Sequence, residues 1–144
     1  MKKDPNYCVS KHFHFYAAHR NTAILGKCSS VHGHVYHVDV SVSAAKNEET
    51  GVTVLFEELD KRIAYLKSDL DHVLLLAEGD DLIPVFAAYN KTAPVRSKVL
   101  VLPMKQTSAE NLAKYVAARM TSLEWEVTKV VLRETESSTV TYKP

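Results

Sequence analysis

Residues 31–43 alternate between two kinds of side chain, and a backbone sorts such a pattern onto two faces only when it is extended. One face carries two histidines followed by an aromatic and aliphatic series: His32, His34, Tyr36, Val38, Val40 and Val42. The other face is polar: His37, Asp39, Ser41 and Ser43. The segment is therefore predicted to be a strand with two chemically different faces.

The same kind of patterning predicts the other elements. Alternation predicts a strand over residues 7–17, and apolar spacings of three and four predict an amphipathic helix over 54–70. Thr107 and Glu110 have the spacing of a capping box, which predicts a second helix. Residues 125–134 and 138–141 are predicted to be two closing strands. The order ββααββ predicts an α+β fold, in which a four-stranded antiparallel sheet carries two helices on one face.

Residues 77–106 form the segment with the weakest pattern. We expect a long loop that ends in an extra edge strand over the apolar run 99–102. The 144 residues fit one domain, 1–144, in which we interpret residues 77–106 as an insertion.

Composition excludes several classes of protein. The 18 Lys and Arg residues against 17 Asp and Glu give a net charge of +1, which argues against a nucleic-acid partner. Two cysteines, Cys8 and Cys28, are too few for a disulfide framework and favour a reducing compartment. Since no signal-peptide pattern and no run of about 20 apolar residues is seen, we expect a cytoplasmic protein without a membrane partner.

The seven histidines include the pair His32 and His34, which share a strand face and lie near enough to bind one ion. Gly33 between them allows close approach of a backbone or ligand. His19 would complete a zinc site if the two strands pair. Cys28 could be a reactive thiolate or a fourth ligand that closes a structural site. The alternative is that the histidines are ordinary core or edge residues.

The adjacent residues Asp71 and His72, and two glutamates, Glu134 and Glu110, are weaker candidates for functional residues. Asp71 and His72 place a carboxylate beside an imidazole just after the first helix, which is compatible with proton transfer or with an ordinary helix end. Glu134 ends a strand, as either a solvated carboxylate or an acceptor for N–H groups of a ligand. Glu110 is accounted for by the capping box.

Taken together, these blocks resemble the 6-pyruvoyl-tetrahydropterin synthase / 6-carboxytetrahydropterin synthase family. The blocks occur along the chain in the same order as in the family, and they span about residues 7–142. The resembling blocks are Phe15-Tyr16-Ala17-Ala18-His19, Gly26-Lys27-Cys28 with His32-Gly33-His34, Leu70-Asp71-His72, Ser108-Ala109-Glu110-Asn111-Leu112 and Glu134-Thr135.

The resemblance implies a role for each matching residue. His19, His32 and His34 would bind Zn²⁺, Cys28 would abstract a proton, and Asp71 with His72 would return one. Glu134 would anchor the pterin, with Ser108 and Glu110 as further substrate-binding candidates. The implied substrate is 7,8-dihydroneopterin triphosphate. The implied fold is the tunnelling fold, in which subunits form a ring, such as a homohexamer, with sites between neighbours.

The gap of three residues between Cys28 and His32 resembles the bacterial carboxy-forming branch linked to queuosine and other deazapurines. This branch implies a carbon–carbon lyase that yields 6-carboxytetrahydropterin, acetaldehyde and triphosphate. Elimination of triphosphate to the pyruvoyl product is the alternative, and a non-catalytic zinc- or pterin-binding protein is a second one. Leu55 and Leu76 depart from the aspartate and asparagine that the family often has there.

Overall fold

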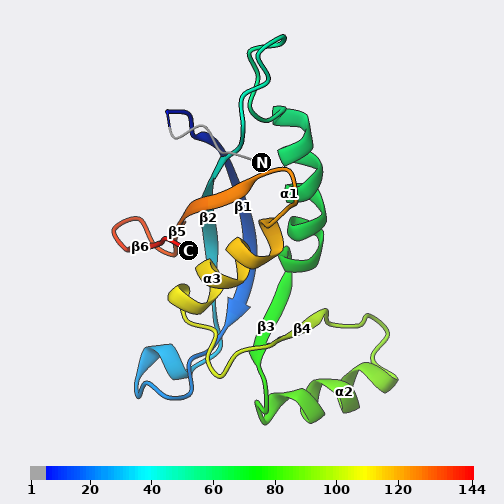
Figure 1. The fold of residues 1–144 in the computed structure, drawn as a ribbon. Helices are drawn as coiled ribbons and strands as arrows, with labels where there is room; N and C mark the ends of the chain where they lie inside the picture. Colours follow the sequence, from blue (N-terminus) through cyan, green and yellow to red (C-terminus); the bar gives the residue numbers. More distant parts are fainter. Residues whose placement is uncertain (1–5) are drawn as a thin grey trace.

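The computed structural model describes residues 6–144. Two of its helices and the strands before and after them follow the predicted order. Further elements lie between these two helices (Figure 1). In chain order the elements are β1 (Val9–His19), a 3-10 turn (Lys27–Ser29), β2 (His32–Ser43), α1 (Phe56–Leu70), β3 (Val73–Ala77), α2 (Leu82–Thr92), β4 (Val99–Leu102), α3 (Ala109–Met120), β5 (Glu126–Arg133) and β6 (Thr139–Tyr142).

The strands form one six-stranded mixed sheet in the order β4-β3-β1-β2-β5-β6. The prediction of a four-stranded antiparallel sheet was therefore wrong in part. The ladders β1–β2, β2–β5 and β5–β6 are antiparallel as expected, whereas β3 and β4 are added beside β1 as parallel strands. The extra edge strand expected over 99–102 is confirmed as β4, with the predicted bounds.

Two elements were missed for physical reasons. All five residues of β3 are buried, so the strand is a continuous apolar run without alternation. Helix α2 holds a proline, Pro84, but this lies in the first turn, where a missing N–H costs nothing. Together β3, α2 and β4 form a β-α-β unit, the connection that two parallel strands require.

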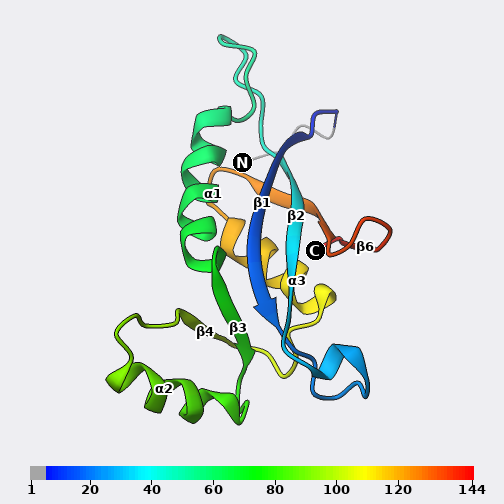
Figure 2. The same ribbon diagram turned by 180° about the vertical axis from the view of Figure 1, so that it is seen from behind.

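Helices α1 and α3 cover one face of the sheet, while Figure 2 shows no helix in front of β1 and β2 on the other. The covered face provides Phe15, Tyr36 and Val38, each fully buried. The helices contribute side chains such as Leu66 and Leu112, also buried. Burying each of these large apolar side chains stabilises the fold by about 1.5–3 kcal/mol.

The helix starts differ from the predicted ones. Ser108, rather than Thr107, is the N-cap of α3, and its hydroxyl oxygen accepts a hydrogen bond from the Asn111 N–H at 3.3 Å. Helix α1 begins at Phe56 rather than at residue 54, and Leu55 is its N-cap without a side-chain hydrogen bond. The departure at Leu55 thus leaves this helix start uncapped, whereas Leu76 is fully buried in β3.

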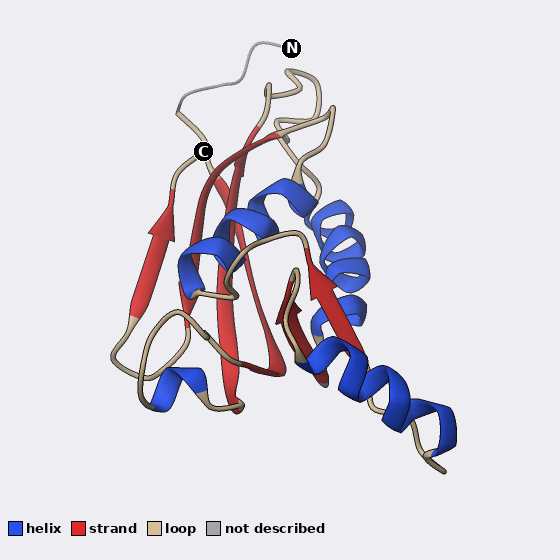
Figure 3. Cartoon of the chain, turned by 90° about the horizontal axis from the view of Figure 1, so that it is seen from below, coloured by secondary structure: helices blue, strands red, loops and turns tan. Residues whose placement is uncertain are grey.

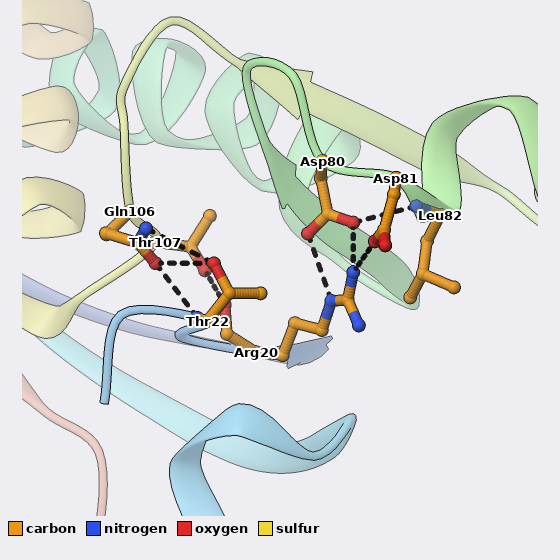
Figure 4. Close-up of polar contacts among 7 residues, drawn as sticks. All are labelled: Arg20, Thr22, Asp80, Asp81, Leu82, Gln106 and Thr107. Atoms are coloured by element: carbon orange, nitrogen blue, oxygen red, sulfur yellow. Dashed lines mark hydrogen bonds and ion pairs between the residues drawn. The ribbon is translucent and has the colours of Figure 1, made fainter. Parts of the chain in front are cut away.

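Helix α2 lies at the same end of the sheet as the loop that follows β1 (Figures 1 and 3). None of its residues is buried, so the core does not hold it in place. Polar contacts hold the start of α2 instead, as Figure 4 shows. Arg20 donates to Asp80 at 2.6 and 3.1 Å and also contacts Asp81, the N-cap of α2. The Arg20 guanidinium is the main reason why the pKa of Asp80 is lowered, so the carboxylate stays ionised.

Within residues 6–144, none of the helices is both long and apolar enough to cross a membrane.

Candidate metal and catalytic site

Three histidines meet where β1 ends and β2 begins. The register pairs His19 with His32 and Ala17 with His34, and the strand period of two turns all three imidazoles to the helix-covered face. Their ring centroids lie 4.7 to 5.2 Å apart. One nitrogen of each ring lies within 4.8 Å of the others, so the group could hold a metal ion.

Backbone carbonyls orient two of these rings. His19 Nδ1 lies 2.7 Å from the Thr107 carbonyl oxygen, and His32 Nδ1 lies 2.6 Å from that of Ser30. Since a carbonyl only accepts, each Nδ1 carries the hydrogen and each Nε2 keeps its lone pair. Fixing the tautomer through the far nitrogen is how metal-binding histidines are commonly held.

Two of the remaining ring nitrogens lack a hydrogen-bond partner. The Nε2 atoms of His19 and His34 are buried without a hydrogen bond in the part of the chain that the structure describes. Burial is the main cause that lowers the pKa of both histidines, because it disfavours the charged ring. Neutral, unpartnered imidazole nitrogens that point at one another fit a metal ion, and three nitrogen donors with a fourth position open suit zinc.

Glu134 and Tyr36 lie beside this histidine group. Glu134 Oε1 is 3.3 Å from His19 Nε2 and 3.6 Å from His34 Nε2, distances at which an ion pair forms only when the ring is protonated. The Tyr36 hydroxyl donates to the same oxygen at 3.4 Å. Burial and the negative charge of Glu134 raise the pKa of Tyr36, so its hydroxyl stays protonated as a donor. Glu134 therefore presents its carboxylate to the site.

Asp71 and His72 form a second unit between α1 and β3. Asp71 Oδ2 lies 2.8 Å from His72 Nδ1, while Oδ1 accepts the Tyr16 N–H at 2.9 Å. This backbone hydrogen bond is the largest cause that lowers the pKa of Asp71. His72 has a φ of 57°, a left-handed conformation that is uncommon outside glycine. The carboxylate thus orients the imidazole through its Nδ1.

A groove of about 840 Å³ is lined by both His34 and His72. A neighbouring groove of about 370 Å³ is lined by His34 and Glu134. The predicted metal-binding, proton-transfer and anchoring residues therefore border adjoining hollows.

Other candidates lie outside the histidine group. Cys28 is exposed in the 3-10 turn, and its carbonyl accepts the Asn21 N–H at 2.6 Å. Ser108 is occupied as a helix cap, and Glu110 is exposed in the first turn of α3. A Cβ added at Gly33 would lie 3.5 Å from the Ala17 carbonyl oxygen, an ordinary contact, so nothing within this chain requires glycine there.

Two supporting residues were missed by sequence reasoning. Tyr36 could have been found, because it continues the period-two series of His32 and His34 onto the same face. Thr107 was interpreted as a helix cap, but it is fully buried and holds His19 through its carbonyl. Its hydroxyl also donates to the Arg20 carbonyl at 3.0 Å. No local sequence pattern indicates that Thr107 contacts His19.

Fold and site together define an α+β protein built on one mixed sheet, with a three-histidine group that could hold a metal. Residues 8–144 match the sequence model of the 6-pyruvoyl tetrahydropterin synthase family, and the chain belongs to this family.

Named relatives agree with that assignment. A 6-carboxy-5,6,7,8-tetrahydropterin synthase from Bacillus subtilis is 30% identical over 94% of this chain and 84% of its own length. One of the same name from Aquifex aeolicus is 26% identical over 94% of this chain and 96% of its own. The solved structure of Caenorhabditis elegans 6-pyruvoyl tetrahydropterin synthase superposes with a TM-score of 0.69 at 22% identity. It covers 96% of this chain and 95% of that one, a likeness of fold.

Proposed function

We propose that this protein is a zinc-dependent lyase that converts 7,8-dihydroneopterin triphosphate and water to 6-carboxy-5,6,7,8-tetrahydropterin, with release of acetaldehyde and triphosphate. The product would serve queuosine or other deazapurine synthesis. The observation that carries the proposal is the group of His19, His32 and His34 with two buried, unpartnered Nε2 atoms. Relatives named for the carboxy product favour this reaction over elimination to the pyruvoyl product.

His19, His32 and His34 would hold the zinc ion, which when bound polarises a substrate oxygen as a Lewis acid. The chain's own residues would move the protons. Cys28 Sγ would take one from the substrate side chain; its turn is tied by the Cys28 carbonyl to Asn21, two residues beyond His19. His72 Nε2 would deliver the other, with Nδ1 held by the ionised Asp71.

Glu134 would bind N–H groups of the pterin. Its carboxylate lines the smaller groove beside His34, where an anionic acceptor meets the donors of a flat heterocycle. Ser108 and Glu110 would lie further out on the substrate side, at the start of α3.

We also expect a ring-shaped homo-oligomer, such as a hexamer, with sites between subunits. The open edges of the sheet support this. β3 pairs with β1 only at Ala17 and Ala18, and Tyr16 contacts Asp71 and His72, which leaves residues 9–15 of β1 without a strand partner on that side among the described residues. β6 ends the sheet on the other side. Unpaired edges of this kind are templates for pairing with another chain. Light scattering that finds a fully active monomer would refute the shared-site arrangement.

The decisive experiment is incubation of the zinc-loaded protein with 7,8-dihydroneopterin triphosphate, followed by mass spectrometry of the products. We expect 6-carboxytetrahydropterin and acetaldehyde. A pyruvoyl product would establish the alternative reaction, and no turnover at full zinc loading would refute both.

Cys28→Ala separates an enzyme from a non-catalytic zinc-binding protein. If Cys28 is the proton-abstracting thiol, this variant keeps its zinc and loses activity. If Cys28 is instead a structural ligand, the variant loses zinc. Cys8→Ala is the matched control, because Cys8 is also an exposed free thiol but lies beside Thr128, with its Sγ 3.4 Å from the Thr128 hydroxyl oxygen.

A further inference from the structure

The larger groove has an uneven composition. Its floor is apolar and consists of outward-facing strand residues such as Ala18 and Val35, while residues 86–98 provide one wall. That wall presents Phe86, Arg96 and Lys98, and no aspartate or glutamate is among the described residues that line the groove. Two permanent cations without a carboxylate favour an anionic ligand.

The backbone that carries Arg96 is held in place. The Asn90 side chain donates to the Ser97 carbonyl at 2.9 Å and accepts the Ser97 N–H at 2.8 Å. The Lys98 ammonium group donates to the Ser68 carbonyl at the end of α1. The groove wall after α2 is therefore fixed to both of the helices that flank it.

Arg96 itself is exposed and has neither a hydrogen bond nor an ion pair within residues 6–144. Arg20, by contrast, is engaged by Asp80. A guanidinium that is positioned by its backbone but left without a carboxylate is suited to bidentate binding of phosphate oxygens.

We infer that Arg96, assisted by Lys98, binds the phosphate groups of the substrate in this groove. The inference rests on the proposed function for the identity of the substrate, and it assigns residues 77–106 a role in substrate binding. Because His34 and His72 line the same groove, a chain of phosphates held by the wall would extend away from the reacting carbons.

The test uses inorganic triphosphate, which requires no turnover. Its binding to the zinc-loaded protein and to chelator-treated protein is measured by calorimetry for wild type, Arg96→Ala and Arg96→Lys. We expect about 10- to 100-fold weaker binding for Arg96→Ala in both preparations, since a hydrogen bond to a charged group contributes about 1.5–3 kcal/mol. Arg96→Lys should recover part of the loss. Raising the salt concentration should weaken wild-type binding.

Arg62→Ala is the matched control, because it removes the same charge from the exposed surface of α1, outside the groove. The inference is overturned if Arg96→Ala and Arg62→Ala bind triphosphate alike, or if binding depends on zinc and not on Arg96. If the wild-type protein turns over the pterin but Arg96→Ala keeps full affinity for triphosphate, this inference is refuted and the proposed function is not. Arg96-dependent binding without any turnover refutes the proposed function alone.

Discussion

Two groups of three histidines lie on the same pair of strands but on opposite faces. The inner group, His19, His32 and His34, lies on the helix-covered face at one end of β1 and β2. The outer group, His12, His14 and His37, lies on the face without helices, with His12 and His37 stacked 5.4 Å apart. The residue type is the same, so the surroundings must account for any difference in chemistry.

The surroundings differ in what each ring nitrogen meets. In the outer group His12 Nδ1 pairs with Asp39 at 3.1 Å, and its Nε2 lies 3.4 Å from His37 Nδ1, at the exposed surface. In the inner group, carbonyls take the Nδ1 hydrogens of His19 and His32, and two buried Nε2 atoms are left without a partner. Of the described histidines, only the inner set converges as a possible metal site. Burial with an oriented lone pair, rather than the number of histidines, identifies it.

The largest difference in zinc affinity should appear when one histidine of each group is replaced by alanine. His34→Ala should weaken zinc binding by more than about 100-fold, because it would remove one of the three proposed ligands, whose loss exceeds that of an outer partner. His37→Ala should leave zinc affinity unchanged. Zinc per chain, measured by plasma mass spectrometry, and competition with a chelator check both. Equal loss of zinc in the two variants would abolish the distinction between the groups.

A second difference should appear with pH in the metal-free protein. The pKa values of His19 and His34 are lower in the fold than the ordinary 6.5, so the unfolded chain binds more protons below that pH. Their contribution to stability is therefore present above pH 6.5 and is lost as the pH falls toward the folded values. Urea unfolding between pH 7.5 and 5 should show this decline, and His34→Gln should reduce its slope.

The matched variant in the outer group is His37→Gln. The pKa of His37 is also lowered, first by burial and then by Arg133, but its ring lies on the face without helices. We therefore expect a smaller change of slope for His37→Gln than for His34→Gln. A larger change would mean that burial does not control the protonation of the inner group.

The smallest difference in zinc affinity should come from replacing a residue that contacts one histidine of each group. Thr107→Val keeps the carbonyl that holds His19 but removes the hydroxyl that lies 3.3 Å from its Nδ1 and donates to the Arg20 carbonyl. We expect about tenfold weaker zinc binding, the low end for outer partners. Asp39→Asn, which alters the partner of His12, should have no effect on zinc. Chelator competition measures both, and an unchanged Thr107→Val would show that the carbonyl alone suffices.

Much of this arrangement could be predicted because the relevant patterns are local. The period of two placed His32 and His34 on one face, and strand pairing then brought His19 opposite His32. Asp71 and His72 are adjacent, so their contact needed no long-range information. The resemblance to the family supplied the roles, which no periodicity could give.

The parts that were missed depend on contacts distant in sequence. Thr107 reaches His19 across 88 residues, and Arg20 reaches Asp80 across 60. β3 lacked alternation because both of its faces are covered, and that depends on elements elsewhere in the chain. Glu134 was expected at a pterin, yet its closeness to His19 and Tyr36 follows only from the order of β5 beside β2.

The joint between α1 and β3 has a consequence for protein engineering. Only Asp71 and His72 separate the end of the helix at Leu70 from the start of the strand at Val73, and the His72 N–H donates to the Tyr16 carbonyl at 2.6 Å. The same two residues thus link the helix to the strand and form the proposed proton-transfer pair. An inserted residue would shift the strand register and the imidazole together. Asparagine, which tolerates φ of 57°, is therefore a better replacement for His72 than a β-branched residue.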